Sequence, residues 1–312
     1  MFVYLVRRLW QMLPTLLGVL LLVFFLFKAF GGDPAEILGG LNATPEQVEQ
    51  IREQLGLNRP VWEQLLIFLK QIATFDWGRS WATQESVASL FATRLPATLT
   101  VMLPILILDA VLAIPLALAV AAVRGSLTDR AIMVVTTVAL SISFLVYVIV
   151  GQWLFAFRLG WFPVQGWSPD LWTNLVTYAP LPVLLAVLVG VSPQTRLYRS
   201  FFLDEIGQDY VRTARAKGLT ERAILLQHVL PNALIPILTH IGIQLPGIFV
   251  GSFLIEVFFS IPGIGREVLL AVNRSDYPVI QAVTVYLAMI TMAVNLIVDL
   301  LYKAVDPRVV LR

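Results

Sequence analysis

Apolar positions along the chain gather into six long runs, near residues 9–30, 97–123, 131–157, 178–198, 233–258 and 280–302. Each run is long enough, as a helix, to cross the roughly 30 Å of hydrocarbon in a bilayer. The composition agrees, because 58% hydrophobic and 13% charged residues lie well outside the range of soluble domains. The pattern predicts an all-α integral membrane protein with six transmembrane helices. Prolines inside the runs predict kinks, at Pro14, Pro104, Pro115, Pro236 and Pro246.

Lysine and arginine give a predicted orientation, since cytoplasmic loops of membrane proteins carry an excess of both. When the N-terminus is placed inside, most of the 22 basic residues fall on the cytoplasmic side: Arg7, Arg8, Arg124, Arg130, Arg196, Arg199, Arg212, Arg215, Lys217, Arg222, Lys303, Arg308 and Arg312. Both termini are therefore predicted to be cytoplasmic. The apolar run after Arg8 is too long for a signal peptide, and no small-residue cleavage site follows it. Residues 1–30 are therefore interpreted as a tail and an uncleaved first span.

The remaining composition excludes several kinds of site. The sequence has no cysteine and two histidines, so we expect no disulfide, no metal centre and no cofactor. It lacks a Gly-x-x-x-x-Gly-Lys-Ser/Thr phosphate loop, and we expect no catalytic residue. A net charge of +2 without a basic and aromatic pattern gives no indication of nucleic-acid binding.

Residues 31–96 form the one sizeable extramembrane piece that the sequence places on the outer side, and they are predicted to be helical. Thr44 and Gln47 have the spacing of a capping box around Pro45, and Gly56 ends that helix. An apolar helix after Pro60 is expected to lie on the membrane surface or against the bundle. Trp62, Trp77 and Trp81 are expected at headgroup depth. A lid, a landing pad for an outside partner and a plain packing connector all stay open as roles.

A polar loop, residues 199–232, separates the fourth and fifth runs. Its helix start and stop signals predict two helices joined by a sharp corner. Good helix formers extend from Glu205 to Lys217, with acidic residues first and basic residues in the last turn. Gly218 stands where a left-handed residue would end this helix. Thr220 is expected to cap a second helix that extends to Leu230 and bends at Pro231.

Ionisable residues inside the predicted spans are candidate functional groups, because burying them in hydrocarbon is costly. Asp109 either lines a pathway or pairs with a structural partner, whereas Glu256 and Asp299 lie near span ends, which favours structural roles. His240 and Gln244 lie one helical turn apart, and Gly247 and Gly251 continue this stripe. The candidate pathway residues are Asp109, His240, Gln244 and Glu256.

The loop sequence from Asp209 to Leu219 resembles the EAA loop in permease subunits of ATP-binding-cassette importers, within the dipeptide, oligopeptide and nickel branch. Arg212-Thr213-Ala214, Gly218 and Leu230-Pro231 occupy the motif positions, with Arg212 and Thr213 replacing the usual Glu and Ala. Further segments resemble the first permease of that branch: Gly32-Asp33-Pro34, Leu55-Gly56-Leu57, Arg94-Leu95-Pro96-Ala97-Thr98-Leu99, Pro262-Gly263-Ile264-Gly265, Asp276-Tyr277-Pro278 and Asn295 to Tyr302. The resemblance covers nearly the whole chain and is weakest over residues 160–180.

This resemblance implies a type I importer permease with a core domain over residues 97–312, in the inner membrane of a bacterium. It implies a coupling helix that contacts an ATPase through Arg212, Thr213, Ala214, Arg215, Ala216, Lys217, Gly218 and Leu219. The implied partners are a second homologous permease, one or two ATP-binding subunits, an extracytoplasmic solute-binding protein and membrane lipid. ATP hydrolysis would then belong to the partners, and the permease would not be an enzyme.

Short peptides are the expected substrate of such a permease. Nickel chelates, glutathione, opines and peptide antibiotics are alternatives within the same class. Two functions from other classes are alternatives. An ion-coupled secondary transporter would use Asp109, but the sequence shows no convincing internal repeat. An intramembrane aspartyl protease would use Asp109 and Asp299, but neither lies in a Gly-x-Gly-Asp context.

Overall fold

A computed structural model of the chain describes residues 2–40 and 43–305, and these form helices and loops with no β-strand among them. The N-terminal half contains α1 Phe2–Phe30, α2 Pro34–Gly39, α3 Pro45–Gln54, α4 Val61–Ala73, α5 Val87–Ala122, α6 Leu127–Ser141, α7 Phe144–Gly151 and the π-helical turn η1 Gln152–Arg158. The C-terminal half contains α8 Leu171–Thr173, the π-helical turn η2 Asn174–Tyr178, α9 Pro180–Ile206, α10 Asp209–Ala216, α11 Glu221–Ile224, the π-helical turn η3 Leu225–Val229, α12 Leu230–Val250, α13 Phe253–Phe258, α14 Ile264–Asn273 and α15 Tyr277–Val305.

Five segments of the described chain are long and apolar enough to cross a membrane, and a sixth qualifies if a bent helix pair is one span. The five are Val6–Phe30, Val87–Ala122, Pro180–Ile206, Glu221–Phe258 and Tyr277–Leu300. They coincide with five of the six predicted runs, which confirms the fold class. Their ends differ from the prediction, because α5 begins well before residue 97 and α9 continues well past residue 198.

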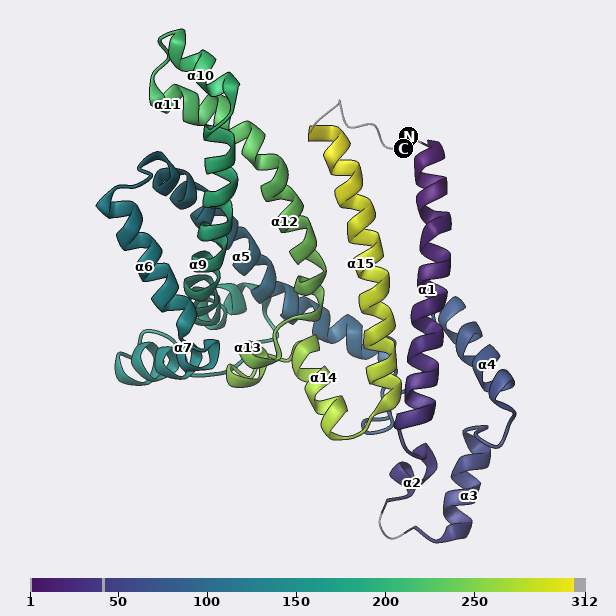
Figure 1. Cartoon of the computed structure of the whole chain (residues 1–312). Coiled ribbons are helices and arrows are strands. Elements are labelled where there is room, and N and C mark those ends of the chain that lie inside the picture. The colour runs from purple at the N-terminus through teal and green to yellow at the C-terminus, as the bar shows by residue number, and fades with distance from the viewer. Residues whose placement is uncertain (1, 41–42, 306–312) are drawn as a thin grey trace.

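The predicted third span, residues 131–157, is a bent pair of helices and not one continuous helix. α6 ends at Ser141, Ile142 adopts an extended conformation, and α7 with η1 departs at 87°. The hydroxyl of Tyr147 donates to the carbonyl of Ala139 at 3.0 Å, and that of Ser141 donates to the carbonyl of Thr137 at 2.9 Å. These hydroxyls bond to carbonyl groups at the break, which makes it tolerable inside a bundle. Figure 1 shows α6 beside α9 and α7 lying across the end of the bundle.

The centre of the bundle is the pair α5 and α9, with α12 packed against both. Small residues on α5, namely Ala113, Ala117 and Ala121, are fully or almost fully buried and let the other helices approach closely. The large side chains of Tyr198 and Phe202 on α9 fill the space beside them. α15 packs against α12 on one side and against α1 on the other. An ion pair of 2.9 Å between Arg8 and Asp299 joins α1 to α15.

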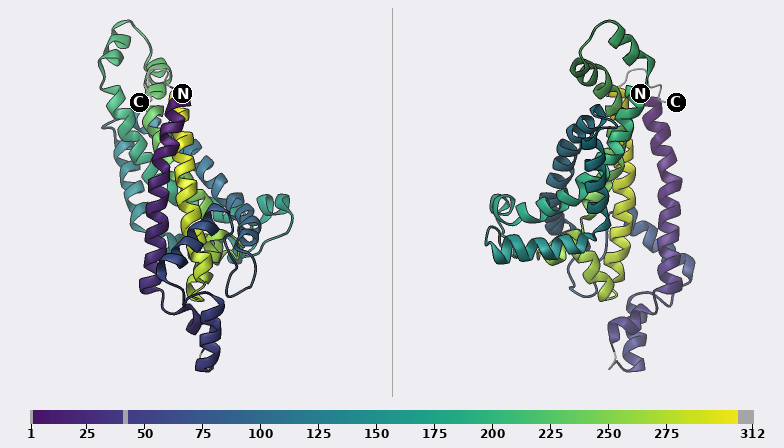
Figure 2. Two further views of the ribbon diagram at one scale, coloured as in Figure 1. Left: turned by 90° about the vertical axis from the view of Figure 1, so that its right-hand side faces the viewer. Right: turned by 60° about the vertical axis from the view of Figure 1, so that its left-hand side comes forward.

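The beginning of α1, the end of α15 and the helices α10 and α11 all lie at one end of the bundle, while α2 and α3 lie at the other (Figures 1 and 2). This arrangement agrees with the prediction that both ends of the chain share a side with the polar loop 199–232. Arg308 and Arg312, which contributed to that prediction, lie outside the described residues.

The outer segment has the local structure that its sequence predicts. The Thr44 hydroxyl accepts from the Gln47 amide at 3.3 Å, and the Gln47 side chain accepts from the Thr44 amide at 2.9 Å, which forms the predicted capping box. α4 packs on α1, where the Phe24 and Phe68 rings lie 5.8 Å apart. The segment is pinned to the start of α15 by Asp276, which is buried and accepts from the backbone amide of Trp81 at 3.0 Å.

Candidate functional site

The predicted helical corner is present, and we call α10, Gly218 and α11 the elbow. Gly218 has a φ of +81°, and its amide donates to the carbonyl of Arg215 at 2.9 Å. The amide of Leu219 donates to the carbonyl of Ala214 at 3.3 Å, which completes a Schellman motif. Thr220 then caps α11 by accepting from the amide of Ala223 at 3.3 Å. Backbone groups at both sides of the corner are therefore satisfied locally.

The start of the elbow differs from the prediction that one helix covers Glu205 to Lys217. α9 continues to Ile206, the chain turns at Gly207 and Gln208, and α10 begins at Asp209. Glu205 instead accepts a hydrogen bond of 2.6 Å from the hydroxyl of Tyr210. Burial, together with Glu205, raises the pKa of Tyr210 to about 12, so the hydroxyl remains a donor at neutral pH. This bond fastens α10 to the end of α9.

The charged side chains of the elbow have different roles. Arg215 donates from Nε and Nη2 to the two carboxylate oxygens of Glu221, at 2.7 and 3.1 Å, and so joins α10 to α11 across the corner. The Glu221 carboxylate raises the pKa of Arg215 above its usual value. Arg212 pairs with Asp209 at 3.1 Å, with both side chains largely exposed. Lys217 has no ion-pair partner within residues 2–40 and 43–305.

The elbow has a buried base, which packs on the bundle, and an exposed tip. Val211 and Ala214 are buried with Phe202 and Ile224, so the base of α10 packs on the bundle. Seven of the eight predicted contact residues are exposed: Arg212, Thr213, Arg215, Ala216, Lys217, Gly218 and Leu219. Beyond the elbow, α11 continues through η3 into α12. This π-helical turn precedes Pro231, which lacks the amide that an α-helical turn would need there.

Inside the bundle, three of the four predicted pathway residues come together in what we call the polar cluster: Asp109, Gln194, Tyr198, His240 and Gln244. Gln194 Nε2 lies 3.3 Å from Asp109 Oδ2 and 3.5 Å from Gln244 Oε1. The hydroxyl of Tyr198 lies 3.3 Å from His240 Nδ1, and Gln244 Nε2 lies 3.1 Å from the same nitrogen. The cluster therefore connects α5, α9 and α12.

Asp109 is held in this cluster by a close approach of backbone. Its side chain is 5% exposed, and a Cβ on Gly190 of α9 would lie 2.4 Å from Asp109 Oδ2. Within the described chain, Asp109 Oδ1 is buried without a hydrogen-bond partner. A buried polar atom in this condition is costly unless water, a proton or a solute satisfies it. The arrangement can fix the packing of three helices and can also present a carboxylate to a passing solute.

Glu256 lies apart from the polar cluster, because the predicted fifth helix does not reach residue 258 unbroken. α12 ends at Val250, Gly251 has a φ of +77°, and Glu256 belongs to α13. Gly251 therefore breaks the helix and does not extend a packing stripe. The carboxylate of Glu256 accepts from the Thr98 hydroxyl at 2.9 Å and from the Arg266 amide at 2.7 Å in the first turn of α14. Glu256 thus ties α5, α13 and α14 together.

Two segments of the chain match known families of membrane proteins. Residues 113–311 match the family described as "Binding-protein-dependent transport system inner membrane component". Residues 1–102 match the corresponding N-terminal family of such membrane components. The chain belongs to this family. It is a multi-pass permease of the bacterial plasma membrane, as the resemblance of its sequence implies.

Relatives of this permease are similar over nearly their whole length. A Brucella abortus protein, named provisionally as a peptide transport system permease, is 36% identical over 97% of both chains. The di/tripeptide transport system permease protein DppB of Pseudomonas aeruginosa is 33% identical over 98% of both chains. The glutathione transport system permease protein GsiC of Salmonella typhi is also 33% identical over 98% of both chains.

Sequence reasoning missed several polar residues that join helices of the bundle. Gln194 and Tyr198 complete the polar cluster, and the signal for Gln194 was an amide inside an apolar run. Arg199 was assigned to the loop, but it lies in α9 and forms two hydrogen bonds, of 2.9 and 2.8 Å, with Asp129 at the start of α6. Asp299 was expected to have a structural role, and it pairs with Arg8.

Proposed function

We propose that the permease forms part of a transmembrane path for short peptides and that an ATPase subunit drives it through the elbow. The observation that carries this proposal is the construction of the elbow. It projects from the bundle, its backbone is capped on both sides of Gly218, and the Arg215–Glu221 pair braces it. Such an element transmits a displacement that a flexible loop would absorb.

The elbow is also continuous with the helices that carry the polar cluster. α9 bears Gln194 and Tyr198 and leads into α10, while α11 leads through η3 into α12 with His240 and Gln244. A movement of the elbow therefore changes the positions of α9 and α12 relative to Asp109 on α5. Hydrogen bonds of 3.3 to 3.5 Å between these helices are long enough to exchange during such a movement. In this proposal, the cluster lies at the part of the path that opens and closes.

The proposal includes partners that supply energy and substrate. ATP hydrolysis takes place on one or two separate ATP-binding subunits, so the permease itself is not an enzyme. A second homologous permease completes the path, and an extracytoplasmic solute-binding protein delivers the peptide to the side of α2 and α3. Both termini and the elbow then face the cytoplasm, in accordance with the distribution of lysine and arginine.

Short peptides are the proposed substrate because the relatives support this class. Their names refer to peptides, to di- and tripeptides and to glutathione, which is itself a tripeptide. Glutathione is therefore the second candidate. The polar cluster also suits this chemistry, since amide and imidazole groups can bond to the backbone of a peptide whatever its side chains.

Uptake by the reconstituted complex tests the proposed function. The permease, its partner subunits and the solute-binding protein would be placed in liposomes, and entry of a radiolabelled dipeptide and of glutathione would be measured. We expect uptake that requires both ATP hydrolysis and the binding protein. Uptake driven by a proton gradient without ATP would instead support a secondary transporter and would contradict the proposal.

A further inference from the structure

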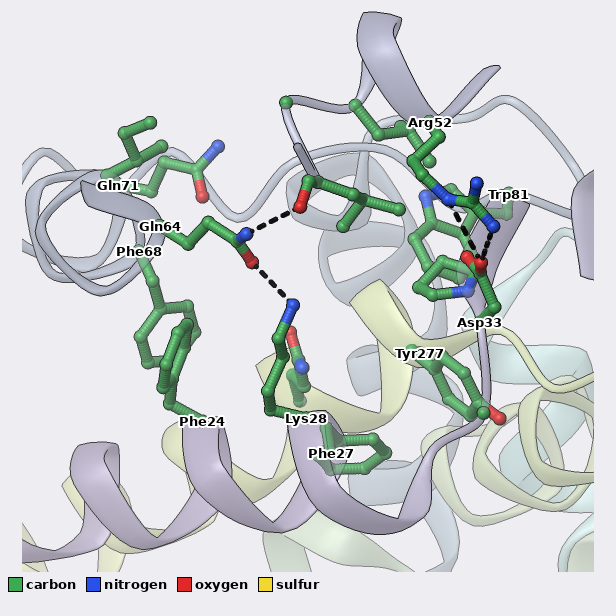
Figure 3. Close-up of a pocket in the computed structure, with 17 residues that line it drawn as sticks. Phe24, Phe27, Lys28, Asp33, Arg52, Gln64, Phe68, Gln71, Trp81 and Tyr277 are labelled. Carbon is green, nitrogen blue, oxygen red and sulfur yellow. Dashed lines mark hydrogen bonds and ion pairs between the residues drawn. The ribbon is translucent and has the colours of Figure 1, made fainter. Parts of the chain in front are cut away.

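A cavity of about 470 Å³ lies outside the polar cluster, between the end of α1, the outer segment and the start of α15. Its volume falls in the range of roughly 300–1,000 Å³ that is usual for pockets that bind small molecules. Its walls combine aromatic rings with one central lysine, from Phe24, Phe27, Lys28, Phe68, Trp81 and Tyr277. Figure 3 shows Lys28 rising from α1 between Phe24 and Phe27, with its ammonium group directed toward Gln64. The cavity is thus shaped by α1, α4 and α15, helices that carry none of the cluster residues.

Among the charged residues that line this cavity, Lys28 is the one without an ion-pair partner within the described residues, and its charge also acts on the Asp33 carboxylate. Arg52, on the opposite wall, forms a hydrogen-bonded ion pair with Asp33 and also bonds to Glu49 at 2.6 Å, so its charge is neutralised. The pairing with Arg52 holds the pKa of Asp33 below its usual value, so the pair is fully charged at neutral pH. Lys28 Nζ donates to Gln64 Oε1 at 3.1 Å and has no ion-pair partner within the described residues. An ammonium group has three donors, so at least one stays available for an anion.

The position of Lys28 sets the depth of this charge in the membrane. Lys28 lies in the last turn of α1, whose spanning part is Val6–Phe30, so its ammonium group lies where hydrocarbon gives way to headgroups. Phe24 lies one helical turn before Lys28 and so deeper in the spanning part of α1, and its ring lies 5.8 Å from that of Phe68. These rings therefore continue the wall toward the hydrocarbon. Beside them, Leu66 and Ile67 of α4 are exposed. A cation at headgroup depth above an apolar wall fits an anionic amphiphile better than a small hydrophilic anion.

We propose that this cavity binds a membrane phospholipid, with the Lys28 ammonium group on its phosphodiester and the rings of Phe24 and Phe68 against the upper acyl carbons. The backbone carbonyl groups of Leu57 and Arg59 hold Gln64, which in turn orients Lys28, with both bonds at 2.8 Å. The lipid fills the space between α1 and α4 and joins the outer segment to the bundle. This inference does not depend on the transported substrate or on the elbow.

Lipid retention by the purified complex tests this site. The complex with the full-length permease would be delipidated in mild detergent and titrated with dioleoylphosphatidylglycerol, and bound lipid would be counted by native mass spectrometry. The Lys28→Met variant should bind about tenfold more weakly at one site, because a hydrogen bond to a charged group is lost. Lys28→Arg should retain binding. Lys70→Met is the matched control, because it removes an exposed lysine of α4 that does not line the cavity.

Binding of other ligands and cross-linking of the wild-type complex complete the test. Inorganic phosphate that competes as well as the lipid would show a free-anion site, and dioleoylglycerol that binds equally well would show that the phosphate is not recognised. Either result would overturn the assignment, as would equal binding by the Lys28→Met and Lys70→Met variants. If Lys28→Met does not fold, a photoactivatable phosphatidylglycerol on the wild-type complex should cross-link within residues 24–28 or 64–71. Cross-links that fall only elsewhere would contradict the proposal.

Discussion

The elbow and the polar cluster differ in the sequence separation of the contacts that hold them. Arg215 and Glu221 are six residues apart, whereas Asp109 and Gln194 are 85 apart. The elbow is exposed at its tip and is complete as a local structure, while the cluster exists only when α5, α9 and α12 are packed together. The comparison shows a rigid local element attached to two helices, α9 and α12, whose middle parts share a loosely bonded polar site. Such an arrangement suits a protein in which a force applied at the elbow rearranges contacts inside the bundle.

The largest loss of uptake is expected from a variant that strains the backbone of the elbow. Gly218→Val imposes this strain. A left-handed conformation costs an L-residue about 1–2 kcal/mol, and a β-branched side chain suffers more. We expect ATP-dependent peptide uptake to fall at least about tenfold while the permease still reaches the membrane. A Cβ at position 218 would meet no atom within 4 Å, so the effect would be conformational and not steric.

Gly207→Ala is the matched control for this variant, because Gly207 adjoins the same helix but has an ordinary φ of −75°. It should retain most of the uptake. Uptake by Gly218→Val close to that of the wild type would show that the left-handed corner is dispensable.

The polar cluster should fail through steric crowding, and Gly190→Ala tests this directly. The added Cβ would lie 2.4 Å from Asp109 Oδ2, so the carboxylate must leave its position. Overpacking of this kind typically costs about 1–3 kcal/mol. We expect a lower thermal unfolding temperature of the purified complex together with weaker uptake.

Gly18→Ala provides the comparison, since a Cβ at this position of α1 would meet no atom of the permease within 4 Å. It should leave the unfolding temperature unchanged. Equal behaviour of the two variants would mean that the contact between Gly190 and Asp109 does not constrain the bundle.

The smallest effect is expected at Arg215. It shows whether this side chain mainly joins α10 to α11 through Glu221 or contacts a partner subunit. Exposed ion pairs contribute about 0.2–1 kcal/mol, so Arg215→Glu alone should lower uptake by at most about fivefold. The double exchange Arg215→Glu with Glu221→Arg restores the pair in the opposite sense. Recovery of uptake in the double variant would identify Arg215 as a brace. A double variant as poor as the single one would show that Arg215 itself contacts a partner.

The elbow could largely be predicted from sequence because its determinants are local. Gly218 and Thr220 each act within a few residues, and the structure confirms both. The capping box at Thr44 in the outer segment is equally local, and it is also confirmed. The start of α10 was not predicted, because the helix formers before Gly207 continue α9 without a recognisable end signal. The bend after Ser141 was missed for a related reason. A hydropathy pattern does not report that Tyr147 can satisfy a carbonyl at the break.

The polar cluster could be predicted only in part. Asp109, His240 and Gln244 were identified one by one, since polar groups inside apolar runs are costly. Their convergence with Gln194 and Tyr198 depends on how three helices pack, and no spacing within one helix encodes this. Glu256 lies apart from these residues, because the left-handed Gly251 ends α12 and places Glu256 in α13, against the first turn of α14.

The claim that the elbow receives the force of an ATPase is tested most directly by site-specific cross-linking. The chain has no cysteine, so Lys217→Cys introduces a unique thiol at the exposed tip of the elbow. Glu53→Cys, exposed on α3 at the opposite end of the bundle, is the control. After labelling with benzophenone maleimide and illumination, the account predicts a covalent product between the permease and an ATP-binding subunit from Lys217→Cys and none from Glu53→Cys. No such product from Lys217→Cys, in a complex that still hydrolyses ATP and transports peptide, would contradict it.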